Sequence, residues 1–388
     1  MDDQQVLTLA KSDGSKGVVR RLPSRSKTNH NTVDQCVRTL LSLAAGNGGK
    51  GVMRELLEWN DVNPHIVNKY GRTPLSVAAE NGHEGVVRVL LEWDDVRPNI
   101  TDKEGRAPLW WAARSGHEGV VRILLEQSGV NPDQVDKYGQ TALSLAAWNG
   151  HEGVVNILLE QNGVNPDQAG KNGHTPLSLA AHNGREGVVR ILRRRNDVNP
   201  NTACQSGRTS LSWAAGNGHE GVVRVLLERN DVNLNRVDKD GQTPLWWAAR
   251  NGHERIVRIL FEQSEATPET ASKYSQTPLR PAAGSGHEEA ARRLLERNDV
   301  NPNSTHQDCK TPLWQVARNS CKRITELLRT KRISFSDKQK ACHRQNSSSL
   351  SPQAYQNSYS KGPIKPNSSI STYSCTHTLH CNSRNSTK

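Results

Sequence analysis

The chain has 388 residues and a formal net charge of +12, to which residues 331–388 alone contribute +8. The remaining 330 residues carry only about +4, so their charge does not mark them as a nucleic-acid-binding array. No stretch reaches the ~18 consecutive apolar residues of a membrane-spanning helix, and the start, Met-Asp-Asp-Gln-Gln, lacks the apolar core of a secretory signal.

A period of 34 residues runs through the chain, as equivalent positions at Thr73, Thr141 and Thr175 illustrate. Such a period is typical of a solenoid, in which each unit packs only on its neighbours. Residues 5–22 follow the same register in a degraded form. We therefore divide the chain into a degraded N-terminal capping repeat with its connection (1–38), an array of repeats (39–330) and a basic tail that we expect to be disordered (331–388). The repeats begin near residues 39, 73, 107, 141, 175, 209, 243, 277 and 311.

Each repeat predicts two short helices. Thr73 before Pro74 provides an N-cap followed by a proline at the first helical position, and Gly82 supplies the left-handed residue that ends this helix. A second helix is expected from 84 to 92. Its buried face is predicted to consist of Val86, Val87, Leu90 and Leu91.

The motif Gly-X-Thr-Pro-Leu-X-X-Ala-Ala-X-Asn-Gly-His, followed by Val-Val-Arg-X-Leu-Leu-Glu and Asp-Val-Asn-Pro, resembles the ankyrin repeat. The resemblance covers roughly residues 39–330, and the 34-residue length is similar to ankyrin arrays of fungal proteins. It implies an all-α ankyrin-repeat solenoid of stacked helix–turn–helix units. The histidine of the family's Thr-Pro-Leu-His is Ser76 or Trp110 here, so the Thr–His side-chain bond should be absent or altered.

Six histidines share one repeat position directly after the capping glycine. Because packed helices lie ~8–10 Å apart, neighbouring copies are too distant to share a metal ion. We interpret them as structural residues at the junction between repeats, and we predict no metal or cofactor. They are His83, His117, His151, His219, His253 and His287.

Basic residues flank the turn glycine, as in the pairs Lys69–Arg72 and Lys103–Arg106. Stacked repeats would align them as a row of basic turn tips that attracts an acidic partner; the alternative is an ordinary solvated edge. Three acids in the same turns should partly offset this charge. They are Asp102, Asp136 and Asp238.

The position two residues before the capping glycine varies most from repeat to repeat. In ankyrin proteins the matching positions face the concave groove, so the resemblance makes these residues candidates for partner binding; drift at an exposed position is the alternative. Trp148, as an exposed tryptophan, is the best contact anchor. The candidate partner-binding residues are Lys69, Arg72, Glu80, Lys103, Arg106, Arg114, Trp148, His182 and Arg250.

Some residues depart from the repeat. Trp111, Trp213 and Trp247 take a leucine position and should pack between repeats, whereas the roles of Trp110, Trp246 and Trp314 stay open. Arg193 replaces a leucine and predicts a local fault at the end of its helix.

Pro281 should remove a helix hydrogen bond or force a kink, and residues 265–330 should be the least stable part of the array. In the tail, Cys375 to Cys381 holds two Cys and two His, which we regard as a coincidence.

No nucleophile elbow, phosphate-binding loop, dinucleotide fingerprint or paired-carboxylate site is found, so we predict no enzyme. Seven cysteines without regular spacing favour reduced thiols and an intracellular protein, in the cytoplasm or the nucleus. The leading hypothesis is a monomeric protein–protein interaction scaffold. One alternative is binding of nucleic acid or an anionic surface by the tail, and another is that the chain is the recognition part of a larger receptor-like protein without its effector domain.

Overall fold

The computed structural model describes residues 40–59, 62–263, 265–274, 276–304, 312 and 322–330. The predictions for residues 1–38 and 331–388 and for Trp314 lie outside these residues. Every regular element in the described part is a helix, which confirms the all-α prediction. The helices are α3 (Leu40–Gly46), α4 (Lys50–Leu57), α5 (Pro74–Glu80), α6 (Glu84–Leu91), α7 (Pro108–Ser115), α8 (Glu118–Leu125), α9 (Ala142–Asn149), α10 (Glu152–Leu159), α11 (Pro176–His182), α12 (Glu186–Leu192), α13 (Ser210–Asn217), α14 (Glu220–Leu227), α15 (Pro244–Arg250), α16 (Glu254–Glu262), α17 (Leu279–Gly284), α18 (Glu288–Glu296) and α20 (Lys322–Thr330).

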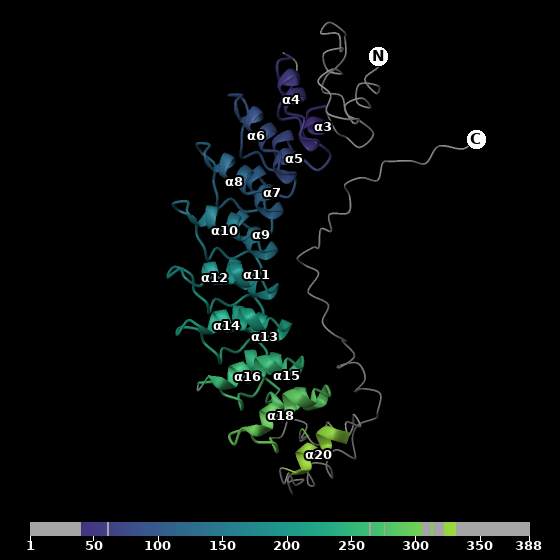
Figure 1. The fold of residues 1–388 in the computed structure, drawn as a ribbon, viewed down its shortest axis with the longest axis vertical. Helices are drawn as coiled ribbons and strands as arrows, with labels where there is room; N and C mark the ends of the chain where they lie inside the picture. Colours follow the sequence, from purple (N-terminus) through teal and green to yellow (C-terminus); the bar gives the residue numbers. More distant parts are fainter. Residues whose placement is uncertain are drawn as a thin grey trace, which may run out of the picture. The chain divides into compact units, whose positions relative to one another are not determined.

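The helices form two rows that the chain visits alternately (Figure 1). The first helix of each repeat packs on the first helix of the next, as α5 does on α7 and α7 on α9; we call α3 to α17, odd numbers only, the inner row. The second helices pack in the same order, α4 on α6 and onward to α18 on α20; we call them the outer row. Stacking of this kind confirms the predicted solenoid, because helices of six to nine residues gain most of their stability from such packing.

The predicted cap of the first helix is present. In α5 the Thr73 hydroxyl accepts a hydrogen bond from the Ser76 N–H at 3.2 Å, and Pro74 is the first helical residue. The Thr73 and Ser76 hydroxyls also lie 3.1 Å apart, so a Thr–Ser contact replaces the Thr–His bond of the family pattern. In α15, where tryptophan replaces the serine, the cap consists of the Trp246 N–H, which donates to the Thr243 hydroxyl at 3.1 Å.

The core is made of small residues on the inner row and larger aliphatic residues on the outer row. Ala78 and Ala79 are fully buried, and so are the equivalent alanines of α7 to α17. In α6 the buried residues are Val86, Val87, Val89 and Leu90. The prediction for Leu91 is therefore wrong: this position is only partly buried, because it lies at the edge of the face that packs on the neighbouring repeats.

This difference explains Arg193, which occupies the position of Leu91 one hundred and two residues later. Helix α12 ends at Leu192, but Arg193 still has right-handed helical backbone angles and donates its N–H to the Val189 carbonyl at 2.9 Å. The predicted local fault therefore amounts to no more than a helix one residue shorter than α14. Arg193 is not an unpaired buried charge, because its guanidinium forms an ion pair with Glu228 of the next repeat. A half-buried position with a carboxylate nearby tolerates arginine.

Pro281 changes the start of its helix. In the inner helices α5 to α15 the equivalent residue donates its N–H to the carbonyl of the capping residue, as Val77 does to the Thr73 carbonyl at 3.1 Å. Pro281 has no N–H, and here the Arg280 N–H donates to the Thr277 carbonyl, while α17 begins only at Leu279. The predicted loss of a helix hydrogen bond is confirmed; the expected low stability of 265–330 stays a prediction. In the described residues no helix has the length and apolar character needed to cross a bilayer.

Candidate functional site

In most repeats one side chain at the base of the turn tip holds the backbone of the turn. The Asp102 carboxylate is buried, and its Oδ1 accepts hydrogen bonds from the Glu104 N–H at 2.9 Å and the Arg106 N–H at 3.0 Å. The expectation that these acids partly offset the basic charge of the turns is confirmed for Asp102 and Asp238, which lie 2.8 Å from Arg106 Nε and 3.7 Å from Arg208 Nε. The same carboxylates also accept hydrogen bonds from backbone N–H groups inside the turn. The equivalent residues that accept the same two backbone N–H groups are Asn68, Asp136, Asp238 and Ser272.

Backbone hydrogen bonds join consecutive tips. The Lys103 N–H donates to the Tyr70 carbonyl at 3.2 Å, and the Lys137 N–H donates to the Glu104 carbonyl at 2.8 Å. The series continues to the Lys273 N–H on the Asp240 carbonyl. Close approach requires glycine: at Gly71, where φ is +80°, a Cβ atom would lie 2.9 Å from the Lys103 nitrogen. The tips therefore form one continuous edge along the array.

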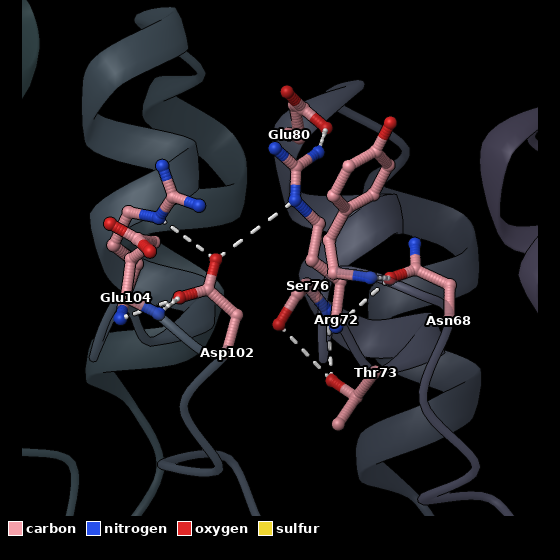
Figure 2. A network of polar contacts seen from close by, with 9 residues as sticks. Asn68, Arg72, Thr73, Ser76, Glu80, Asp102 and Glu104 are labelled. Carbon is pink, nitrogen blue, oxygen red and sulfur yellow. Dashed lines mark hydrogen bonds and ion pairs between the residues drawn. The ribbon is translucent and has the colours of Figure 1, made fainter. Parts of the chain in front are cut away.

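The lysines and arginines of the tips lie on different surfaces. Lys69 and Lys103 are exposed at the tips, as predicted. Arg106 is only 7% exposed, and its Nε lies 2.8 Å from Asp102 Oδ2. Arg72 Nη1 lies 2.5 Å from Glu80 Oε2, and its Nε lies 4.0 Å from the same Asp102 oxygen (Figure 2).

Arg72 and Arg106 are thus not exposed tip residues, and that prediction is wrong. Arg72 directly precedes Thr73, the cap of α5, so its side chain lies against the inner helices, where Glu80 and Asp102 compensate its charge. Burial lowers the pKa of Arg72, and the two carboxylates act in the opposite direction. We call the surface formed by the residues after the turn glycines and by the inner-row side chains that contact them the inner face.

At its N-terminal end the inner face holds an arginine–tryptophan cluster. The Arg72 guanidinium lies 3.6 Å from the centre of the Trp111 ring, and that of Arg106 lies 4.4 Å from it. The rings of Trp110 and Trp111 meet edge to face with centroids 4.9 Å apart. Both tryptophans are buried, which confirms the packing predicted for Trp111 and gives Trp110 a role in the core as well.

The centre of the inner face is aromatic. Trp148 and His182 are stacked with ring centroids 5.5 Å apart, and His182 meets Trp213 at 4.7 Å. Trp148 is therefore partly buried against a neighbour, so its prediction as an exposed residue is wrong, although it does lie between Arg114 and His182 along the array. His174 contacts Trp213 from the turn side, at 5.5 Å.

Both histidines of this centre are uncharged at neutral pH. Burial, with a smaller effect of the neighbouring His182, lowers the pKa of His174 to about 4. Burial is also the main cause that lowers the pKa of His182. The centre is therefore a neutral aromatic surface between clusters that contain arginine.

A second arginine–tryptophan cluster follows the aromatic centre. The Arg208 guanidinium lies 3.2 Å from the centre of the Trp247 ring, and its Nε lies 3.7 Å from Asp238 Oδ2. The Trp247 indole N–H donates to the same oxygen at 3.0 Å. Arg250 lies 5.2 Å from the ring of Trp246, which is buried. Burial lowers the pKa of Arg208 to about 10, so it keeps its charge at neutral pH.

The variable position contributes its backbone to the junction between repeats. The Arg114 carbonyl accepts hydrogen bonds from His151 Nε2 at 3.0 Å and from the Asn149 amide at 3.1 Å, both in the next repeat. This confirms the histidines as junction residues; in one repeat Arg185 replaces histidine and donates to the Trp148 carbonyl. Since the junction uses only a carbonyl, the side chain at the variable position is free to change. The other carbonyls bonded to a junction histidine belong to Gly46, Glu80, His182 and Gly216.

The structure brings the predicted inner-face residues Glu80, Arg114, Trp148, His182 and Arg250 onto one surface along the array, and adds residues that the sequence analysis did not assign to this surface. His174 and Trp213 belong to the aromatic centre, and Arg208, which follows a turn glycine, belongs to the inner face as well. The sequence held a signal for His174 and Arg208: the position after the turn glycine also varies between repeats. Its occupants are Arg72, Arg106, Gln140, His174, Arg208 and Gln242.

A comparison with protein-family models matches the ankyrin-repeat model, which describes three copies of the repeat, to five overlapping segments that together span residues 7–306. The segments are 7–102, 94–169, 162–238, 193–271 and 230–306. The comparison with curated proteins returned no match. Within the described residues, no three His, Cys, Asp or Glu side chains lie together in a way that could hold a metal ion.

Proposed function

Since this chain belongs to the ankyrin repeat family, whose repeats generally mediate protein–protein interactions, we propose that it is a non-enzymatic scaffold that binds a protein partner through the concave groove and the turn tips. The inner face lines this groove in the proposal. The residues that contact the partner there are Glu80, Arg114, Trp148, His182 and Arg250, and those at the tips are Lys69 and Lys103. Arg72 and Arg106 support the surface from behind, since both are engaged with carboxylates.

The observation that carries this proposal is the stacked pair Trp148–His182 at the centre of the inner face. Both side chains are only partly buried, and both stand at a position whose side chain the junction does not use. Aromatic residues flanked by arginine are enriched where protein partners bind tightly. A neutral aromatic centre between charged clusters offers a partner an apolar anchor and a polar rim.

The experiment is partner capture with a matched control. The full chain is used as bait, together with the triple variant Arg114→Ala/Trp148→Ala/Arg250→Ala. The control variant removes the same residue types from exposed positions on the outer row and its loops: Trp93→Ala/Arg97→Ala/Arg122→Ala. Captured proteins are quantified by mass spectrometry, and thermal unfolding is recorded for all three proteins.

We expect the inner-face variant to lose at least one partner that the wild type and the control variant retain, with similar unfolding temperatures for both variants. Equal capture by the inner-face variant would contradict the groove proposal. Equal loss by both variants would point to general destabilisation.

The basic tail remains a second candidate on a single observation, its local charge of +8. Binding of nucleic acid or an anionic surface by residues 331–388 would be dominated by charge and would weaken steeply as salt is raised. A filter-binding assay with the full chain and with a chain ending at residue 330 separates the two functions, since groove binding does not depend on the tail.

A further inference from the structure

Exposed apolar side chains gather at the turn tips. In the described part of the chain seven large hydrophobic side chains are exposed, and only one of them, Trp93, lies away from the tips. The other six are 41–49% exposed and lie at the tip or three residues before its tyrosine position. They are Val67, Tyr70, Val135, Tyr138, Val237 and Tyr274. A soluble surface does not require this concentration, so it indicates a contact surface.

The same tips carry exposed lysines. Among the residues that the structure describes, the ammonium groups of Lys103, Lys171 and Lys239 have no hydrogen bond or ion pair. Lys137 pairs with the Glu104 carboxylate, and this bond raises the pKa of Lys137. We call the lysines at 69, 103, 137, 171, 239 and 273, with the six apolar residues above, the tip row.

Spacing along the tip row is regular because backbone hydrogen bonds join the tips. Consecutive lysines are one repeat apart, except that Gln205 stands between Lys171 and Lys239, and Tyr70 and Tyr138 are two repeats apart, with Glu104 at the position between them. A partner that lies along this edge therefore meets positive charge at nearly every step and an exposed apolar group at four of the seven tips.

The tyrosine rings favour a polypeptide over a nucleic acid. Lys69 Nζ lies 4.9 Å and the Arg72 guanidinium 5.7 Å from the centre of the Tyr70 ring. Lys137 Nζ lies 5.0 Å from the centre of the Tyr138 ring. Single-stranded nucleic acids bind by stacking bases on open aromatic faces, and here a cation already lies over a face of the Tyr70 ring and of the Tyr138 ring.

We propose that the tip row binds an extended acidic polypeptide segment in which apolar side chains recur among the carboxylates. Its carboxylates pair with Lys69, Lys103, Lys171 and Lys239, and its apolar side chains contact the valines and tyrosines between them. This inference rests on the proposed function as a protein-binding scaffold, and it adds the chemistry of the partner.

The test uses three labelled probes with the full chain. The first is an acidic peptide in which tyrosine follows every third glutamate, the second has serine in place of each tyrosine, and the third is an oligothymidylate of similar length. Binding is measured by fluorescence anisotropy at low and at physiological salt. We expect the tyrosine peptide to bind tightest and the oligothymidylate weakest, with binding of both peptides reduced by salt.

Two variants with the same change of charge decide where the peptide binds. Lys69→Glu/Lys103→Glu/Lys171→Glu reverses three tip lysines, and Arg97→Glu/Arg122→Glu/Arg194→Glu reverses three exposed arginines elsewhere on the array. We expect the first to weaken binding of the tyrosine peptide by at least about tenfold, and the second by less than about threefold. A further variant, Tyr70→Ser/Tyr138→Ser, should abolish the preference for the tyrosine peptide over the serine peptide.

Three outcomes would overturn the inference: no binding of the tyrosine peptide, equal weakening by both charge variants, or tighter binding of the oligothymidylate. The Arg114→Ala/Trp148→Ala/Arg250→Ala variant, run with the same probes, should still bind the tyrosine peptide. If it loses captured partners while no probe binds the wild type, the scaffold function stands and only the tip-row inference fails.

Discussion

The side-chain amide of Asn201 donates a hydrogen bond of 2.6 Å to the carbonyl oxygen of Asp231, thirty residues along the chain. The equivalent residues Asn99 and Asn235 make the same bond, and His65 makes it through Nε2. Asp133 and Asp167 occupy this position in two other repeats, and a carboxylate cannot donate. Their Oδ1 atoms are buried without a hydrogen-bond partner.

We therefore predict that Asp167→Asn stabilises the array. The new amide restores a donor where the carboxylate oxygen is unsatisfied, which should add about 1 kcal/mol to the free energy of unfolding. Urea unfolding of wild type and variant measures the change. The reverse substitution, Asn201→Asp, is the control and should destabilise by a similar amount; an Asp167→Asn variant no more stable than wild type would contradict the prediction.

The same residue predicts a pH dependence. Burial raises the pKa of Asp167, and the nearby Asp197 acts in the same direction, while the Asn199 N–H and Arg229 oppose them. A carboxyl group with a raised pKa in the folded state binds more protons when folded than when unfolded. Its contribution to stability therefore rises as the pH falls from neutral through the folded pKa, and levels off below the ordinary value.

The measurement is the difference in free energy of unfolding between Asp167→Asn and wild type across the acid range. Other carboxyl groups titrate in both proteins and cancel in this difference. Burial also raises the pKa values of Asp136 and Glu269, and the bond to Arg229 lowers the pKa of Asp231. The advantage of the variant should shrink as the pH falls. An advantage that is constant with pH would exclude Asp167 as the titrating group.

A third prediction concerns the buried Trp111 indole, whose Nε1 has no hydrogen-bond partner. The equivalent Trp247 donates to Asp238 Oδ2, because Gln242 stands there in place of Arg106, the arginine whose Nε bonds the equivalent oxygen of Asp102. Arg106→Gln should let Trp111 donate to Asp102, which would slow exchange of its indole proton in NMR. Gln242→Arg should have the opposite effect on Trp247, and an unchanged rate in both variants would refute the explanation.

The fourth prediction tests the junction. His151→Ala removes the Nε2 bond to the Arg114 carbonyl, and we expect a loss of about 1–3 kcal/mol in the free energy of unfolding. The Asn149 amide still contacts this carbonyl, so the cost should lie toward the lower end of that range. Arg185→His, at the position where arginine already makes the bond, should leave stability nearly unchanged, as urea unfolding would show.

The scaffold was largely predictable from the sequence, because its determinants are local and repeated. Thr73 and Pro74 cap a helix, Gly82 ends it, and Ala78 and Ala79 leave room only for a close neighbour. The 34-residue step then fixes the stacking order. Each of these features is determined by residues close together in the sequence.

The placement of the candidate site residues was less predictable. Lys69 and Arg72 flank the same glycine and carry the same charge. Lys69 is nevertheless exposed at the tip, whereas the Arg72 guanidinium lies against the Trp111 ring. Only the turn geometry separates them, and Asp102, an acid from the next repeat, stabilises the result. Trp148 was likewise expected to be exposed because its partner, His182, is a full repeat away.

The junction built on the carbonyl of the variable position has a consequence for how such a chain changes over time. A bond between a histidine and a backbone oxygen is the same whichever side chain that backbone carries. Loss of residues 141–174 would bring Arg185 opposite the Arg114 carbonyl in place of the Trp148 carbonyl, and the stack would close without a mismatch. Whole repeats can therefore be deleted, duplicated or reordered without loss of the stacked scaffold. Each such change alters the order of the side chains that the inner face presents to a partner.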